Sequence, residues 1–143
     1  MINMNRIRFI VIALFLSLVS AEAAADVVAV VSAKNPVTTL SKNQVVDIFL
    51  GKANRFPDGH EAVPIDQDEG SAAREEFYLK FADKSPSQIK AFWSKMIFTG
   101  RGQPSPEVPN GAEVKKFIAE HPDAIGYIDQ KLVDDSVKVI LTK

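Results

Sequence analysis

The sequence predicts an α/β protein in which helices cover a mainly parallel sheet. Two observations indicate this class. Short β-branched and apolar runs, which suit buried strands, alternate along the chain with longer segments whose apolar residues recur at helical spacing. Clusters of Gly, Pro, Asn and Asp separate these segments and mark turns. Because no internal repeat or long linker divides the sequence, we expect a single domain.

The first 25 residues have the layout of a secretory signal peptide. Arg6 and Arg8 give a basic start, residues 10–19 are almost wholly apolar, and three alanines at 23–25 supply a cleavage site. The alternative is a membrane anchor, but the apolar stretch is short for a bilayer and no second one follows. We therefore expect cleavage after residue 25, a single domain over residues 26–143, and a periplasmic location.

Composition and motifs argue against several classes of function. The whole chain has a net charge of −1, and removing two arginines and one glutamate with residues 1–25 leaves −2, which gives no electrostatic case for binding nucleic acid. Cysteine is absent, and neither His60 nor His121 has a helical partner at metal-ligand spacing. No nucleophile elbow or Walker loop occurs. We therefore expect a protein that is not an enzyme and uses no metal or cofactor.

The first half of the domain is expected to contain two strands and two helices. Residues 27–31 are a continuous β-branched and alanine run, which predicts a buried strand. Ser41 caps the first predicted helix and Gly51 ends it. Residues 62–65 suit a short strand, and a helix follows over residues 71–82.

The third predicted helix begins at Pro86, which suits a first turn. Its apolar stripe has two interpretations, a ligand platform around Trp93 or part of the core, and helical spacing among aliphatic residues favours the core. The stripe consists of Ile89, Phe92, Trp93, Met96 and Ile97. The remaining expected elements are a Gly- and Pro-rich loop, a helix and two strands, at residues 99–111, 112–120, 123–128 and 137–141.

Residues 64–77, PIDQDEGSAAREEF, place a Gly-Ser step at the start of a predicted helix, directly after an apolar run. Gly70 permits close approach, Ser71 offers a hydroxyl, and the backbone N–H groups of Ala72 and Ala73 point out of the helix end. The segment is therefore a candidate oxyanion site.

The same segment is also explained as a capped helix that holds no ligand. Asp68 or Ser71 would accept a helix N–H, and acidic residues are favourable at the positive end of the helix dipole. The carboxylates of Asp66, Asp68 and Glu69 would repel an anion. Local chemistry alone favours the cap.

Arg101, between two glycines in TGRGQ, is a further candidate for an oxyanion or a partner carboxylate. The simpler alternative, an exposed arginine after a helix that ends in Gly, is somewhat stronger for a single residue.

Three segments in order resemble the periplasmic phosphate-binding proteins of ABC transporters, the PstS-like family. They are LSKNQVVDIFLGKANRFPDG, PIDQDEGSAAREEF and PDAIGYID, at residues 40–59, 64–77 and 122–129. The resemblance spans nearly all of the expected domain. It implies a single three-layer α/β lobe with a mainly parallel or mixed sheet, like one domain of a type II periplasmic binding protein.

The departures from the family pattern affect the predicted site. The family has two lobes around a cleft, and this chain is long enough for only one. Gly70 and Ser71 match the family's phosphate loop, but its next Gly and Thr are alanines here, at residues 72–73. The family's loop arginine is replaced by an acid or amide at residues 66–67, so the nearest cations in kind are Arg74 and Arg101.

Two functions follow from the residues and the resemblance together. The first is periplasmic solute binding, of phosphate or a similar oxyanion, linked to phosphate transport or sensing. Its predicted ligand residues are Gly70, Ser71, Ala72, Ala73, Arg74 and Arg101. The alternative is an interaction module that has lost the ligand and docks on a sensor, transporter or envelope protein. A lone lobe exposes a face that suits a homodimer or another protein partner.

Overall fold

Residues 26–142 are described by the structure, a computed structural model, and the predicted signal peptide lies outside them. The main sheet has the strand order β3-β6-β1-β7, and its long central strands are β1, Val27–Ser32, and β6, Ala124–Asp129. β7, Val137–Val139, lies at one edge and β3, Val63–Pro64, at the other.

The sheet is mixed. β1 runs antiparallel to both β6 and β7, with Ala29 opposite Tyr127, whereas β3 is parallel to β6. Of the two sheet types that the resemblance allowed, the mixed one is present, and the mainly parallel arrangement expected from the alternation of elements is absent from the part of the chain that the structure describes. Two further parallel pairs join two-residue strands, β2 with β8 and β4 with β5, at Thr39–Leu40, Leu141–Thr142, Asp66–Gln67 and Glu107–Val108.

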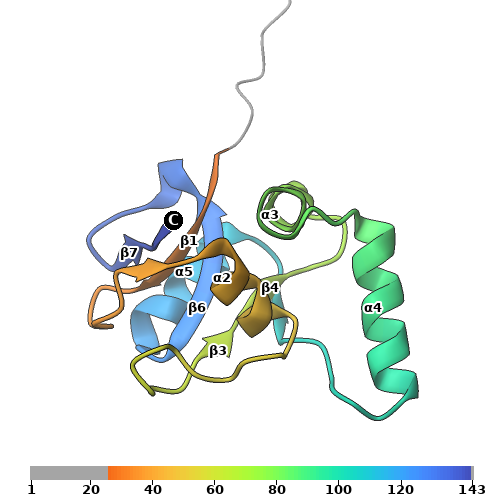
Figure 1. The fold of residues 1–143 in the computed structure, drawn as a ribbon. Helices are drawn as coiled ribbons and strands as arrows, with labels where there is room; N and C mark the ends of the chain where they lie inside the picture. The colour runs from red at the N-terminus through yellow and green to blue at the C-terminus, as the bar shows by residue number, and fades with distance from the viewer. Residues whose placement is uncertain (1–25, 143) are drawn as a thin grey trace, which may run out of the picture.

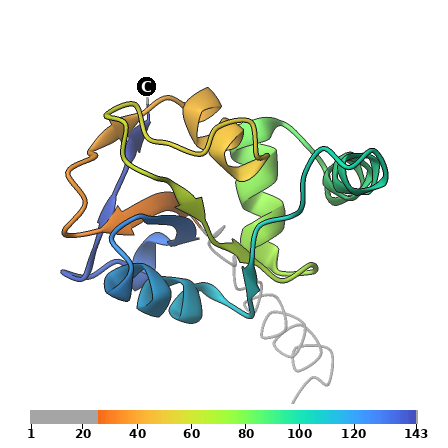
Figure 2. The ribbon, with the colours of Figure 1, turned by 90° about the horizontal axis from the view of Figure 1, so that it is seen from below.

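The helices make a three-layer lobe around this sheet. Alternate side chains of β1 and β6 face opposite ways, as strand geometry requires. Ala29 and Tyr127 pack with the apolar residues of α2, Lys42–Phe49, and α3, Ala72–Ala82. Val30 and Ile128, on the other face, pack with Val114 and Ile118 of α5, Gly111–Glu120. Figure 2 shows α5 on one side of the sheet and α2 on the other.

The helix starts agree with the sequence. Ser41, Ser71 and Ser85 are the N-cap residues of α2, α3 and α4, and each side chain accepts a backbone N–H from the first turn. Ser41 and Ser85 also form reciprocal capping boxes, with Gln44 and Gln88. A short 3₁₀ turn at Gln130–Leu132 follows β6.

Helix α4, Pro86–Phe98, lies at the end of the molecule beyond α3 (Figure 1). The core interpretation of its apolar stripe is right for Ile89 and Trp93, which are buried, and Trp93 lies against Gly51 after α2. It is wrong for Ile97, which is exposed together with Phe98. Among the helices of residues 26–142, none has the length and apolar character that crossing a membrane would require.

Candidate functional site

The segment singled out in the sequence forms the junction between β4 and α3. Gly70 has a φ of +90°, a left-handed conformation that glycine adopts without strain. It turns the chain from the strand into the helix, and the N–H of Ser71 donates to the carbonyl of Asp68 in this turn. The predicted strand–Gly–Ser–helix arrangement is therefore present.

Ser71 is a helix cap in this structure. Its hydroxyl accepts the N–H of Arg74 at 3.3 Å and donates to the side-chain oxygen of Gln67 at 2.9 Å. Within residues 26–142 the N–H groups of Ala72 and Ala73 have no hydrogen-bond acceptor, as expected for the first turn of a helix. The donors that remain for an anion are thus backbone groups, while the hydroxyl is engaged within the protein.

Asp66 is buried at the centre of the junction, with 3% of its surface exposed. Its carboxylate accepts hydrogen bonds from the hydroxyls of Tyr78, at 2.5 Å, and Tyr127, and from the backbone N–H of Gln67 at 2.9 Å. These donors come from β4, α3 and β6. One carboxylate therefore ties the loop to both the helix and the main sheet.

Arg74 crosses the same junction from the first turn of α3. Its Nη1 donates to the carbonyl of Gln67 and to the Glu107 carboxylate, both at 2.8 Å, and lies 3.9 Å from Asp66. Burial alone would lower the pKa of Arg74, but the neighbouring carboxylates outweigh it and raise that pKa. Nη2 and Nε have no acceptor within residues 26–142, so part of the guanidinium is free to bind a ligand.

The two tyrosines that contact Asp66 are the only tyrosines in the chain. Burial raises the pKa of both hydroxyls, and the Asp66 carboxylate raises it further by repelling a phenolate and by accepting the hydrogen bond. Both phenols therefore stay protonated in the folded protein at pH values where free tyrosine ionises.

We expect this burial to shift the ionisation of both tyrosines, and so the whole tyrosinate absorbance signal, to higher pH. In denaturant, ultraviolet absorbance should report ionisation near the ordinary pKa of 10.0, whereas in the native protein the signal should appear only at higher pH, together with unfolding. Because the folded-state pKa values are raised, their contribution to stability is fully present below pH 10 and is lost as the pH rises above it. A native titration curve that matches the denatured one would contradict the buried network.

A hollow of about 160 Å³ opens beside this junction, between α3, α4 and the loop before β5. Gly70 and Arg74 lie on its wall, together with Tyr78 and Trp93. Arg101 is not among its lining residues and instead borders a shallow depression with Ile97 and Gln103. The structure thus brings Arg74 and the Gly70–Ala73 turn together and places Arg101 in a neighbouring depression, which shares Ile97 with the hollow.

Three residues of the junction carry roles that the sequence reasoning did not assign. Tyr127 and Tyr78 hold Asp66, and Glu107 holds Arg74 from 33 positions away. The signals were indirect: a tyrosine inside a buried apolar strand, and a second tyrosine one helical turn after Arg74. Each polar group needs a partner when it is buried.

Comparison with solved structures relates this fold to phosphate-binding proteins. The chain superposes on a protein described as a phosphate ABC transporter substrate-binding protein from Clostridium perfringens, solved with bound phosphate, with a TM-score of 0.67 at 22% identity. The TM-score is 0.65 at 20% identity for an ABC-type phosphate transport receptor from Vibrio cholerae, and 0.59 at 14% for PstS from Borrelia burgdorferi.

These matches cover 82%, 82% and 83% of this chain but only 45%, 46% and 47% of the respective structures. The chain therefore spans less than half the length of the proteins it resembles. No protein-family model matches it, and no curated protein matches it either. The predicted resemblance to PstS-like proteins is confirmed in the fold.

Proposed function

We propose that the chain is a non-enzymatic binding protein that holds phosphate or a similar small oxyanion at the start of α3. The observation that carries this proposal is the β4–Gly70–Ser71–α3 junction, which lies within a fold that superposes on phosphate-binding proteins. A helix N-terminus favours an anion through its free N–H groups and its dipole.

In this proposal the anion contacts the N–H groups of Ala72 and Ala73 and the free edge of the Arg74 guanidinium. Binding is weak because acidic groups outnumber basic ones around the junction. Asp66 and Glu107 already neutralise Arg74, Glu69 is paired with Lys90, and Asp68 adds an exposed charge beside the turn. A singly charged oxyanion is therefore favoured over a dianion.

Calorimetry with phosphate, sulfate and arsenate tests this proposal. We expect a phosphate Kd on the order of millimolar that weakens further with added salt. Arg74→Gln should weaken phosphate binding by about ten- to a hundredfold, because it removes a charge-assisted donor next to the turn. Arg101→Ala is the matched control and should leave binding unchanged, since Arg101 is not among the residues that line the hollow beside the turn. If none of the three anions binds at millimolar concentration, the proposal is contradicted.

The second candidate is an interaction module that binds no anion. The observation that favours it is the engagement of Ser71 and Arg74 within the protein, together with the apolar side chains that α4 exposes. In that case no anion would stabilise the protein against unfolding, and the surface of α4 would carry the function.

We also propose that the protein is exported and acts in the periplasm. This rests on the basic and apolar pattern of residues 1–25 and the alanines that end it. Mass spectrometry of periplasmic extracts should find a mature chain that begins at or near Asp26. A chain that retains Met1 and sediments with the inner membrane would contradict export by cleavage.

A further inference from the structure

The last turn of α4 presents an isolated aromatic side chain to solvent. Phe98 is 92% exposed, the highest value among the exposed large apolar residues of the described chain. Ile97 beside it is more than half exposed. Covering an apolar ring in this position with another surface removes it from water, which lowers the free energy.

The hollow beside α3 lies next to this ring on the same helix. Lys90 and Ser94 of α4 line the hollow, and Phe98 follows at the next helical repeat of four. The hollow measures about 160 Å³, and Ile89 and Trp93 contribute apolar wall. A protein cavity of about 150 Å³ holds one benzene molecule, so the hollow matches a phenyl ring in size.

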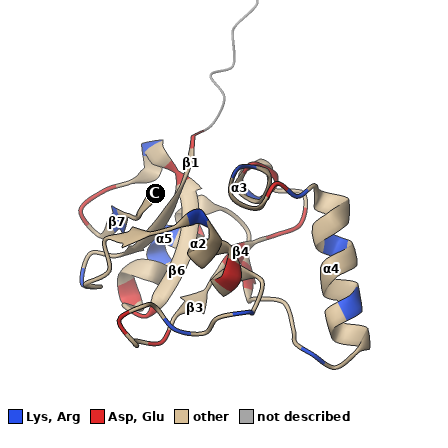
Figure 3. Cartoon of the chain, viewed as in Figure 1, with Lys and Arg blue, Asp and Glu red and all other residues tan. Residues whose placement is uncertain are grey.

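Among the residues that the structure describes, the charges that have no ion-pair partner on the two features are opposite. Lys95 and Arg101 flank Phe98 in sequence and take part in no ion pair within residues 26–142. Three glutamates line the hollow, and two of them are paired with cations that line it as well, Glu69 with Lys90 and Glu107 with Arg74. Glu75 has no ion-pair partner in the described chain. Figure 3 shows basic residues along α4 and in the loop after it, and acidic residues in the segment that leads into α3.

We propose that two copies of this chain pair antiparallel along α4, so that Phe98 of each copy fills the hollow of the other. An antiparallel arrangement places Phe98 of one copy opposite Ser94 of the second. A two-fold axis makes the contact reciprocal and closed. In this register Arg101 of one copy lies level with Ala91 of the other, beside Lys90, whose charge is paired with Glu69. Among the described residues, Glu75 is then the unpaired carboxylate of the hollow that remains as a partner for this arginine.

The hollow that receives Phe98 has Gly70 and Arg74 on its wall, so the pairing adjoins the proposed oxyanion site. The two proposals still fail in different experiments, because sedimentation in a buffer without phosphate, sulfate or arsenate reports the pairing alone. Phe98 is also fully on the surface, so its replacement leaves the core unchanged.

Sedimentation velocity tests the pairing. It is measured over a range of concentrations on the protein purified after expression of the whole sequence from Met1. We expect a reversible dimer, and Phe98→Ser should weaken dimerisation by about thirtyfold because it removes the buried anchor. Leu141→Ser, an equally simple change at an apolar residue that is 65% exposed on β8, is the control and should leave the dimer intact. Circular dichroism should show both variants folded.

A charge exchange identifies the paired surfaces. Arg101→Glu alone and Glu75→Arg alone should each weaken the dimer, and the double variant should restore it, since the opposite charges then meet again across the axis. A strict monomer at high concentration would overturn the proposal. A dimer whose dissociation constant is unchanged by Phe98→Ser would also overturn it. So would a double variant whose loss of dimerisation free energy equals the sum of the losses in the two single variants.

Discussion

Replacing Asp66 by alanine is expected to lower the free energy of unfolding by about 3–5 kcal/mol. The carboxylate is the shared acceptor of the Tyr78 and Tyr127 hydroxyls, and all three side chains are buried. Without it, two buried hydroxyls lose their acceptor. The cost comes from unsatisfied donors more than from the lost pairing itself.

Asp68→Ala is a matched control for this change. Asp68 lies two residues further along the same segment, and its side chain is exposed and makes no hydrogen bond or ion pair in the described chain. Urea unfolding should give a large fall in midpoint for Asp66→Ala at an unchanged slope, and a shift within the usual surface range for Asp68→Ala. Equal midpoints for the two variants would show that Asp66 has no special role.

This role for Asp66 changes how the segment is understood. From the sequence, an acid after an apolar run is an ordinary surface residue, and the resemblance treats the position as one where a family arginine is missing. The structure places the acid inside, where it organises the loop. The same side chain that would reduce the attraction for a dianion therefore also holds the candidate turn in shape.

Much of the architecture could be predicted because its signals are local. Serine caps, the glycine after α2 and the apolar runs of β1 and β6 each specify an element from a few neighbouring residues. Strand direction is not local. A strand buried on both faces has the same apolar pattern in parallel and antiparallel pairs, so β1 gave no indication that it runs against β6.

The strands that the sequence did not predict are too short to show a periodic pattern of apolar residues. β4 and β5 have two residues each, and β5 lies within a segment that its prolines mark as a loop. Their pairing nevertheless brings Glu107 to Arg74. The turn that contains Gly70 and Ser71 was predictable as a candidate site because its signal is local. The partners of its side chains were not predictable, because they are distant in the sequence.

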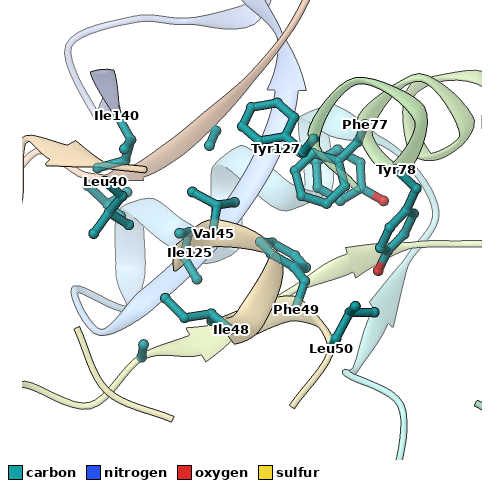
Figure 4. Close-up of a cluster of buried hydrophobic side chains, with 14 of the residues drawn as sticks. Leu40, Val45, Ile48, Phe49, Leu50, Phe77, Tyr78, Ile125, Tyr127 and Ile140 are labelled. Atoms are coloured by element: carbon teal, nitrogen blue, oxygen red, sulfur yellow. The ribbon is translucent and has the colours of Figure 1, made fainter. Parts of the chain in front are cut away.

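Phe77→Ala is expected to destabilise the protein by about 3–5 kcal/mol, because it removes the ring at the centre of the aromatic core. Phe77 is fully buried, and its ring stacks on that of Tyr127 with 4.1 Å between centroids and 5° between planes. The ring of Phe49 lies 4.8 Å away in an edge-on arrangement. Figure 4 shows these rings together, with residues from α2, α3 and β6 converging.

The expected consequence reaches the candidate site, because Phe77 supports the ring whose hydroxyl binds Asp66. A cavity beside Tyr127 should let that phenol ionise at lower pH than in the wild type, closer to the ordinary value. Phe98→Ala, at a concentration where the protein is monomeric, is the matched control for loss of a phenyl ring and should change neither the unfolding midpoint nor the tyrosine titration. If Phe77→Ala lowered stability but left the titration of both tyrosines unchanged, the aromatic core would stabilise the fold without positioning the Asp66 network, and the shape of the Gly70–Ser71 turn would then depend on the hydrogen bonds of Gln67 and Arg74 alone.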